Sequence, residues 1–124
     1  MVREKSFRIR DSHLFVREAG SGFPVLLLHG NPDSSDVWDD VIPHLSEDYR
    51  CITPDLPGLG RSKAPPDFDF SFENLGRVVE EIVDALGVST PLHLVAHDFG
   101  GAFGMAWAVL RPDRVRTITI INHP

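Results

Sequence analysis

The sequence predicts an α/β protein in which a mostly parallel sheet carries helices on both faces. Two strand patterns come first, and strand and helix patterns then alternate over the rest of the 124 residues. This order favours parallel strands joined by helical crossovers. The aliphatic run at 24–28 supports it, because strands buried on both faces are continuously apolar. The length predicts one domain over 1–124.

The expected strands are short apolar or β-branched runs bounded by turn residues. They cover residues 7–10, 13–17, 24–28, 51–53, 92–96 and 117–121. The first two flank a turn at 11–12, and Pro54 stops the fourth. Cys51 lies within the fourth run, so we expect a buried side chain rather than a reactive thiol.

Three segments have helical patterns. The first begins at the serines of 34–35, which can cap a helix. Its expected apolar face consists of Trp38, Val41, Ile42 and Leu45. The second follows a loop over 57–69. It begins at Ser71 and has Gly87 as its C-terminal cap. Its apolar stripe consists of Leu75, Val78, Val79, Ile82, Val83 and Leu86. The third, 100–110, is small or apolar all round, which predicts a buried helix.

Charge and composition exclude several kinds of partner. The net charge is −6 and no basic run occurs, which argues against nucleic acid. No apolar run approaches the 18 or so residues that cross a bilayer, so we expect no membrane partner. The single cysteine cannot form an internal disulfide, and the charged N-terminus does not resemble a signal peptide. We therefore expect a cytoplasmic protein. No pair of His or Cys has metal-ligand spacing, and no cofactor is expected.

Unusual polar residues follow four of the expected strands. They occur at 29–32, 55–58, 97–100 and 122–124. Parallel strands bring their carboxyl ends to one edge of a sheet, which is where ligands of such sheets bind. The segment at 97–100 places Asp98 between a strand and a helix, with Ala96 and Gly100 as small flanking residues. A nucleophile elbow has this form, because its tight turn has no room for larger neighbours.

The chemistry of this pattern depends on Asp98. A carboxylate can displace a leaving group from a saturated carbon and form an ester, and water would then attack that ester. The backbone N–H groups of Phe99 and Asn31 are the expected oxyanion hole. The Asn31 side chain adds a donor for an anionic leaving group, and Gly30 lets the backbone turn sharply. The alternatives are that Asp98 only caps its helix, and that Asn31 and Pro32 are ordinary turn residues.

Together these segments resemble the first half of the α/β-hydrolases that use an Asp nucleophile, namely the haloalkane dehalogenases and the epoxide hydrolases. The similar segments are HGNPDSS at 29–35 with Trp38, PDLPGLGRS at 54–62 and HDFGG at 97–101. The resemblance implies a catalytic Asp98, with Asn31 and Phe99 at the oxyanion and halide site. His29, Gly30, Pro32 and Gly100 support the motifs.

The chain departs from the pattern of these families. Phe99 stands where haloalkane dehalogenases usually have a Trp that helps to hold the halide, and it has no donor. Asn122 stands where some members have the acid of the triad, so we expect that acid on a later strand. The family continues with a helical cap, two further strands, the triad acid and the catalytic histidine. None of these is present, so the resemblance implies the amino-terminal part of a truncated hydrolase core.

Six histidines occur in the chain, and His123 is the one that could replace the missing base. His97 directly precedes Asp98, so its side chain is expected to point away from that carboxylate. We expect the backbone of His29 to matter more than its imidazole. His13, His44 and His93 lie away from the predicted edge.

The function hypotheses come from two classes. The first is a hydrolase of small apolar organic substrates, acting as a haloalkane dehalogenase or an epoxide hydrolase. The second is a catalytically incomplete fragment or binding domain, in which case the unpaired edge of the last strand favours self-association. A serine esterase is disfavoured, because no serine occupies the centre of the elbow.

Overall fold

A six-stranded sheet in the order β1-β2-β4-β3-β5-β6 forms the centre of the molecule, which the computed structural model describes over residues 2–122. The strands are β1 (Val2–Ile9), β2 (Ser12–Ala19), β3 (Phe23–Leu28), β4 (Tyr49–Pro54), β5 (Leu92–His97) and β6 (Val115–Ile121). β3 runs parallel to β4 and β5, and β5 runs parallel to β6, whereas β2 is antiparallel to β1 and β4. The predicted mostly parallel sheet is confirmed.

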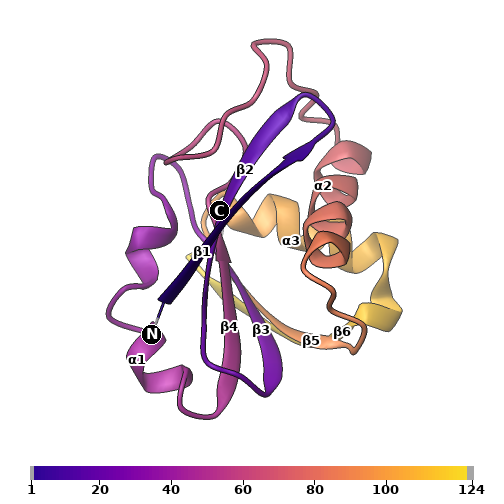
Figure 1. Cartoon of the computed structure of the whole chain (residues 1–124). Coiled ribbons are helices and arrows are strands. Elements are labelled where there is room, and N and C mark those ends of the chain that lie inside the picture. The colour runs from indigo at the N-terminus through magenta and orange to yellow at the C-terminus, as the bar shows by residue number, and fades with distance from the viewer. Residues whose placement is uncertain (1, 123–124) are drawn as a thin grey trace.

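The two faces of the sheet carry separate apolar clusters, because successive strand residues point to opposite sides. The helices are η1 (Ser35–Trp38), α1 (Ile42–Leu45), α2 (Phe72–Ala85), α3 (Gly100–Leu110) and η2 (Pro112–Arg114). Leu26 and Leu28 of β3 belong to the cluster with α2 and α3, whereas Val25 and Leu27 pack with Trp38. Figure 1 shows α2 and α3 together on one side of the sheet and α1 on the other. The prediction of helices on both faces is therefore confirmed.

The segment 34–45 differs from the single helix that the sequence predicts. It forms the short turn η1 and then the short helix α1, with Pro43 in the first turn of α1. Proline has no N–H to donate, so a continuous helix through residue 43 would lose a hydrogen bond. Val41 consequently lies outside the expected apolar face and is exposed, while Trp38 and Ile42 are buried.

The boundaries of α2 agree with its sequence signals. The Ser71 hydroxyl accepts a hydrogen bond from the Asn74 N–H at the start of the helix. At the end, Gly87 adopts a positive φ, and Val88 N–H donates to the Val83 carbonyl in a Schellman arrangement. All six residues of the predicted apolar stripe are buried, so the prediction is confirmed.

Helix α3 has the predicted bounds but is less buried than predicted. Its first two turns pack against the sheet and α2, and Phe103 and Trp107 are fully buried. At its end, Val109 and Leu110 are exposed to 67% and 50%. The apolar composition predicted burial on every side, but among residues 2–122 no element covers this last turn. Cys51 is buried in β4 as predicted, and burial raises the pKa of its thiol.

The parallel pairing brings the loops after β3, β4 and β5 to one edge of the sheet. Backbone and side-chain hydrogen bonds join these loops, with Leu56 N–H donating to His29 and Asn31 N–H donating to Asp98. The end of β6 lies at the same edge, because Asp98 N–H donates to the carbonyl of Ile121, the last residue of that strand. The sheet thus gathers residues from distant parts of the sequence, and His123 and Pro124 lie outside the described residues.

Candidate active site

Asp98 lies at the sharp turn between β5 and α3. Its φ is +53°, a left-handed conformation that residues with a side chain adopt rarely. Hydrogen bonds hold it there from both sides, because its N–H donates to the Ile121 carbonyl and its carbonyl accepts from Gly101 N–H. Such a conformation persists only where the surrounding structure enforces it, and it often marks a functional position.

Two glycines allow this turn to approach the end of β3. A Cβ on Gly100 would lie 2.5 Å from the carbonyl oxygens of both Leu28 and His29. A Cβ on Gly30 would lie 2.6 Å from the Cβ of Asp98. Real Cβ atoms do not approach neighbouring atoms so closely, so both positions require glycine for packing. The result is that the loop after β3 contacts the side chain of residue 98.

The contact between these loops is a hydrogen bond from backbone to carboxylate. Asn31 N–H donates to Asp98 Oδ2 over 3.1 Å, and the Asp98 side chain is half-buried. Asn31 and Pro32 are exposed, and the peptide bond between them is cis. The sequence predicts Asn31 and Asp98 at one edge of the sheet, and the structure brings them into direct contact.

A hollow of about 200 Å³ opens beside this contact. It is lined by Asn31, Pro57, Gly58, Leu59, Phe70 and Phe99. Phe99 is half-buried, and its ring lies 6.2 Å from that of Phe70 and 5.4 Å from that of Phe103, centroid to centroid. Phe70 itself is more than half exposed. The lining of this hollow is therefore mainly apolar, with the amide of Asn31 as a polar group.

His29 has more partners than the sequence revealed. Its imidazole is fully buried, with Nε2 2.8 Å from the Leu56 nitrogen and Nδ1 2.6 Å from the Gly30 oxygen. Burial lowers the pKa of His29, so the neutral ring is favoured. The imidazole thus joins the loop after β3 to the loop after β4.

Asp55 connects two segments of the neighbouring loops, although it is not among the site residues that the sequence predicts. Its buried carboxylate accepts hydrogen bonds from Ser35 N–H at 2.7 Å and from Arg61 N–H at 2.8 Å. The Arg61 guanidinium adds an ion pair at 3.1 Å. Burial alone would raise the pKa of Asp55, but the hydrogen bonds from Ser35 and Arg61 outweigh it and lower that pKa. Its place directly after a strand in the 54–62 motif was the available signal.

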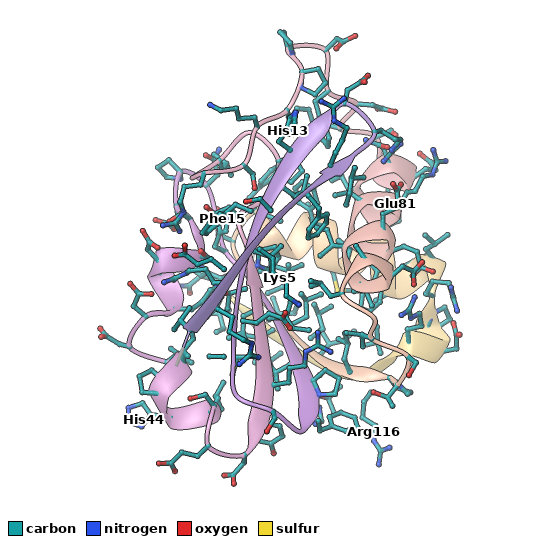
Figure 2. The ribbon with its side chains drawn as sticks, in the orientation of Figure 1. Lys5, His13, Phe15, His44, Glu81 and Arg116 are labelled. Carbon is teal, nitrogen blue, oxygen red and sulfur yellow. The ribbon has the colours of Figure 1, made fainter. Side chains whose placement is uncertain are left out.

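The side chains of the other histidines within residues 2–122 lie away from this contact. The His97 ring packs edge-on against Trp38, with centroids 6.4 Å apart, on the face opposite the one that α3 covers. Within residues 2–122, His97 Nδ1 and Trp38 Nε1 are buried without a hydrogen-bond partner. His93 pairs with Thr117, and Figure 2 labels His13 and His44 at separate ends of the molecule. His123, the candidate base, lies outside the described residues.

Across residues 2–122, no group of His, Cys, Asp or Glu side chains gathers in a way that could hold a metal ion. In the same part of the chain, no helix has the length and apolar character needed to span a bilayer.

Comparison with known proteins identifies the family. A family model described as alpha/beta hydrolase fold matches residues 24–124. A haloalkane dehalogenase of Mesorhizobium japonicum is 45% identical over 108 residues, which are 86% of this chain and 34% of that protein. A cis-3-alkyl-4-alkyloxetan-2-one decarboxylase of Shewanella oneidensis is 36% identical over 105 residues, or 83% of this chain and 33% of that protein.

A solved epoxide hydrolase structure superposes with a TM-score of 0.90 at 34% identity, over 97% of this chain and 42% of that one. The chain spans about a third of the length of the two curated relatives named above. The family match and the shared fold lead to the same assignment. The chain belongs to the α/β-hydrolase family.

Proposed function

We propose that this chain carries the nucleophile of a hydrolase that resembles the haloalkane dehalogenases, with Asp98 as that nucleophile. The hydrogen bond from Asn31 N–H to Asp98 Oδ2, at a left-handed turn between a strand and a helix, is the observation that carries the proposal. A nucleophile elbow has this strand–turn–helix form. The 45% identity to a haloalkane dehalogenase supports the same reaction class.

The proposed reaction has two covalent steps. In the first, a carboxylate oxygen of Asp98 attacks a saturated carbon, the carbon–halogen bond breaks and halide leaves with the bonding electrons. In the second, water attacks Cγ of the ester, a base takes its proton, and the alcohol leaves as the carboxylate is restored. The N–H groups of Asn31 and Phe99 would stabilise the negative charge on the ester oxygen. The Asn31 side chain would contact the leaving halide.

Covalent labelling tests this role of Asp98. A small iodoalkane should add one alkyl group to the native chain, and intact-mass measurement with peptide mapping should place it on residue 98. Asp98→Asn should abolish the adduct, because an amide oxygen is a far weaker nucleophile than a carboxylate. Asp33→Asn, which changes a carboxylate in the neighbouring loop, is the matched control and should label normally. Equal labelling of Asp98→Asn would refute the proposal.

An epoxide hydrolase is the second candidate within this class. Phe99 favours it, because a phenylalanine ring has no N–H to hold a halide. The TM-score of 0.90 to an epoxide hydrolase structure supports it as well. Diol formation from an epoxide without halide release from haloalkanes would select this branch, and the reverse result would select the dehalogenase.

An inert chain is the alternative from another class. The chain spans about a third of its relatives, and we propose that the base and the triad acid come from residues outside 1–124. Asn122, at the end of β6, is an exposed amide and cannot act as that acid. Labelling without turnover would support this alternative, and turnover by the purified chain would exclude it.

We also propose that the chain associates with itself through β6. This strand is at one edge of the sheet, and Ile118, Ile120 and Ile121 are exposed on it. An edge strand with exposed apolar side chains is a template for pairing with another strand. Sedimentation velocity over a range of concentrations should show dimers or larger species, and a monomer at all concentrations would exclude the proposal.

A further inference from the structure

The buried imidazole of His29 exists in one tautomer. The Leu56 nitrogen is a backbone N–H and can only donate, so Nε2, 2.8 Å away, must accept. A neutral imidazole with a bare Nε2 carries its proton on Nδ1. Nδ1–H therefore donates to the Gly30 carbonyl oxygen, 2.6 Å away. The loop after β4 thus determines that the ring nitrogen facing the Gly30 carbonyl carries the proton.

The Gly30 carbonyl and the Asn31 N–H belong to the same peptide unit. A trans peptide is planar, so its C=O and N–H point in opposite directions. The carbonyl is held by the imidazole and by Asp33 N–H at 3.0 Å, so the N–H is directed to the opposite side. On that side lies Asp98 Oδ2, at 3.1 Å.

This peptide unit needs an anchor because it follows a glycine. Glycine rotates freely about its backbone torsions, and a peptide next to it can turn over at little steric cost. Residue 30 must nevertheless be glycine, since a Cβ there would lie 2.6 Å from the Cβ of Asp98. The close approach of the two loops thus excludes a side chain at residue 30, which would have limited rotation of the Gly30–Asn31 peptide. The hydrogen bond from the His29 imidazole limits that rotation instead.

We propose that His29 is a positioning residue that holds the Gly30–Asn31 peptide with its N–H toward the reacting carboxylate of Asp98. This inference rests on the proposed function, in which the oxygen that accepts from Asn31 becomes negatively charged during ester cleavage. His29 does not touch the reacting atoms, and it acts through the orientation of one peptide plane. The contact with Leu56 N–H acts on the imidazole alone, because it fixes the tautomer in which Nδ1 carries the proton and donates.

Two substitutions separate the two contacts of the ring. In His29→Asn the side-chain NH₂ is bonded to Cγ, as Nδ1 is, and it can still donate to the Gly30 carbonyl. In His29→Gln the longer side chain brings an amide oxygen to about the position of Nε2, and it can accept from Leu56 N–H. Both variants replace the ring with a neutral amide, so a general loss of packing affects them alike.

Nuclear magnetic resonance tests the geometry without any reaction. In the native chain, ¹⁵N shifts should show His29 protonated on Nδ1 and bare on Nε2. In His29→Gln, hydrogen exchange at the Asn31 amide should accelerate about tenfold or more, the order expected for loss of one hydrogen bond, while Leu56 stays protected. In His29→Asn, Leu56 should lose protection and Asn31 should keep it. An Nε2–H tautomer, or equal loss at Asn31 in both variants, would overturn the proposal.

Cleavage of the Asp98 ester tests the consequence. After labelling with an iodoalkane, hydroxylamine should attack Cγ, release the alcohol and leave a hydroxamate, which needs no histidine base. His29→Gln should slow this step about tenfold or more, whereas His29→Asn should stay within about threefold of the native rate. Equal rates in the two variants would contradict positioning by the Gly30 contact. If the native chain takes no label, the proposed function fails, and the magnetic resonance result alone decides the role of His29.

Discussion

Side-chain size at single positions determines how closely the turn at residue 98 approaches β3. Gly100 is the first residue of α3, and a Cβ added to it would lie 2.5 Å from the carbonyl oxygens of Leu28 and His29. Those oxygens belong to the backbone of a central strand and the loop after it, so they cannot move aside. Gly104, one turn later, would place its Cβ 3.1 Å from the end of the Leu94 side chain, which can shift.

We therefore expect Gly100→Ala and Gly104→Ala to differ in stability. Gly100→Ala should lower the free energy of unfolding by about 1–3 kcal/mol, because the added methyl group overpacks against backbone. Gly104→Ala should change it by less than about 1 kcal/mol, because the helix propensity of alanine offsets the tighter packing. Urea unfolding monitored by tryptophan fluorescence measures both. Equal changes in the free energy of unfolding would show that the backbone around residue 100 shifts readily to make room for a methyl group.

The carboxylate of Asp55 makes stability depend on pH. Its pKa is lower in the folded chain than its ordinary value, because hydrogen bonds from Ser35 and Arg61 outweigh the effect of burial. A depressed folded-state pKa adds stability above the unfolded-state value of about 3.9, and this stability disappears as pH falls through the folded-state pKa.

Asp55→Asn should accordingly make the stability of the folded chain fall less steeply as the pH is lowered. At pH 7 we expect the variant to lose about 1–3 kcal/mol, because an amide satisfies the three donors around it less well. The difference from the native chain should shrink as pH falls below about 4. Urea midpoints between pH 3 and 7 measure it. A difference that stays constant over this range would mean that Asp55 does not titrate with folding.

Local signals at the element scale were reliable where they specified both ends of a segment. α2 begins after Ser71 and ends before Gly87, as predicted, because a cap hydroxyl and a left-handed glycine act within a single turn. The segment 34–45 had a start signal and an apolar pattern, but Pro43 divides it into η1 and α1. An apolar pattern alone therefore does not establish a continuous helix.

Removal of the α2 cap should cost a measurable part of the stability. Ser71→Ala deletes the hydroxyl that accepts from Asn74 N–H, and we expect a loss of about 1 kcal/mol. Ser89→Ala, at an exposed serine after the same helix, is the control and should change stability by less than about 0.5 kcal/mol. Thermal unfolding followed by circular dichroism compares the two. A loss as large in Ser89→Ala would argue against a specific capping effect.

At the scale of the whole molecule, the two edges of the sheet differ. The outer strand β1 carries charged residues such as Arg3, Glu4 and Lys5, which discourage pairing with another chain. The opposite outer strand, β6, carries isoleucines and threonines along most of its exposed length. The proposed self-association therefore belongs to the β6 edge.

A charge on β6 should weaken that association. Ile120→Lys should raise the dissociation constant about tenfold or more. Pairing of two β6 strands would then bury the lysine ammonium groups or bring these like charges close together. Ser6→Lys, on the exposed β1 edge, should leave it unchanged. Sedimentation velocity at matched concentrations measures both variants. Association unaffected by Ile120→Lys would place the contact elsewhere on the molecule.

The sequence by itself determined the types of most elements, the mostly parallel sheet and the edge at which the polar loops gather. These properties follow from apolar periodicity, caps and strand order, all of which are local in the chain. The sequence predicted the Asn31 N–H in an oxyanion hole, but only the tertiary structure showed its hydrogen bond to the carboxylate side chain of Asp98. The tertiary structure also decided that His29 joins two loops and that Asp55 binds Arg61 and Ser35. The Asn31–Asp98 contact joins residues 67 positions apart. Periodicity does not specify such a contact, because it depends on how closely two loops approach once the sheet has formed.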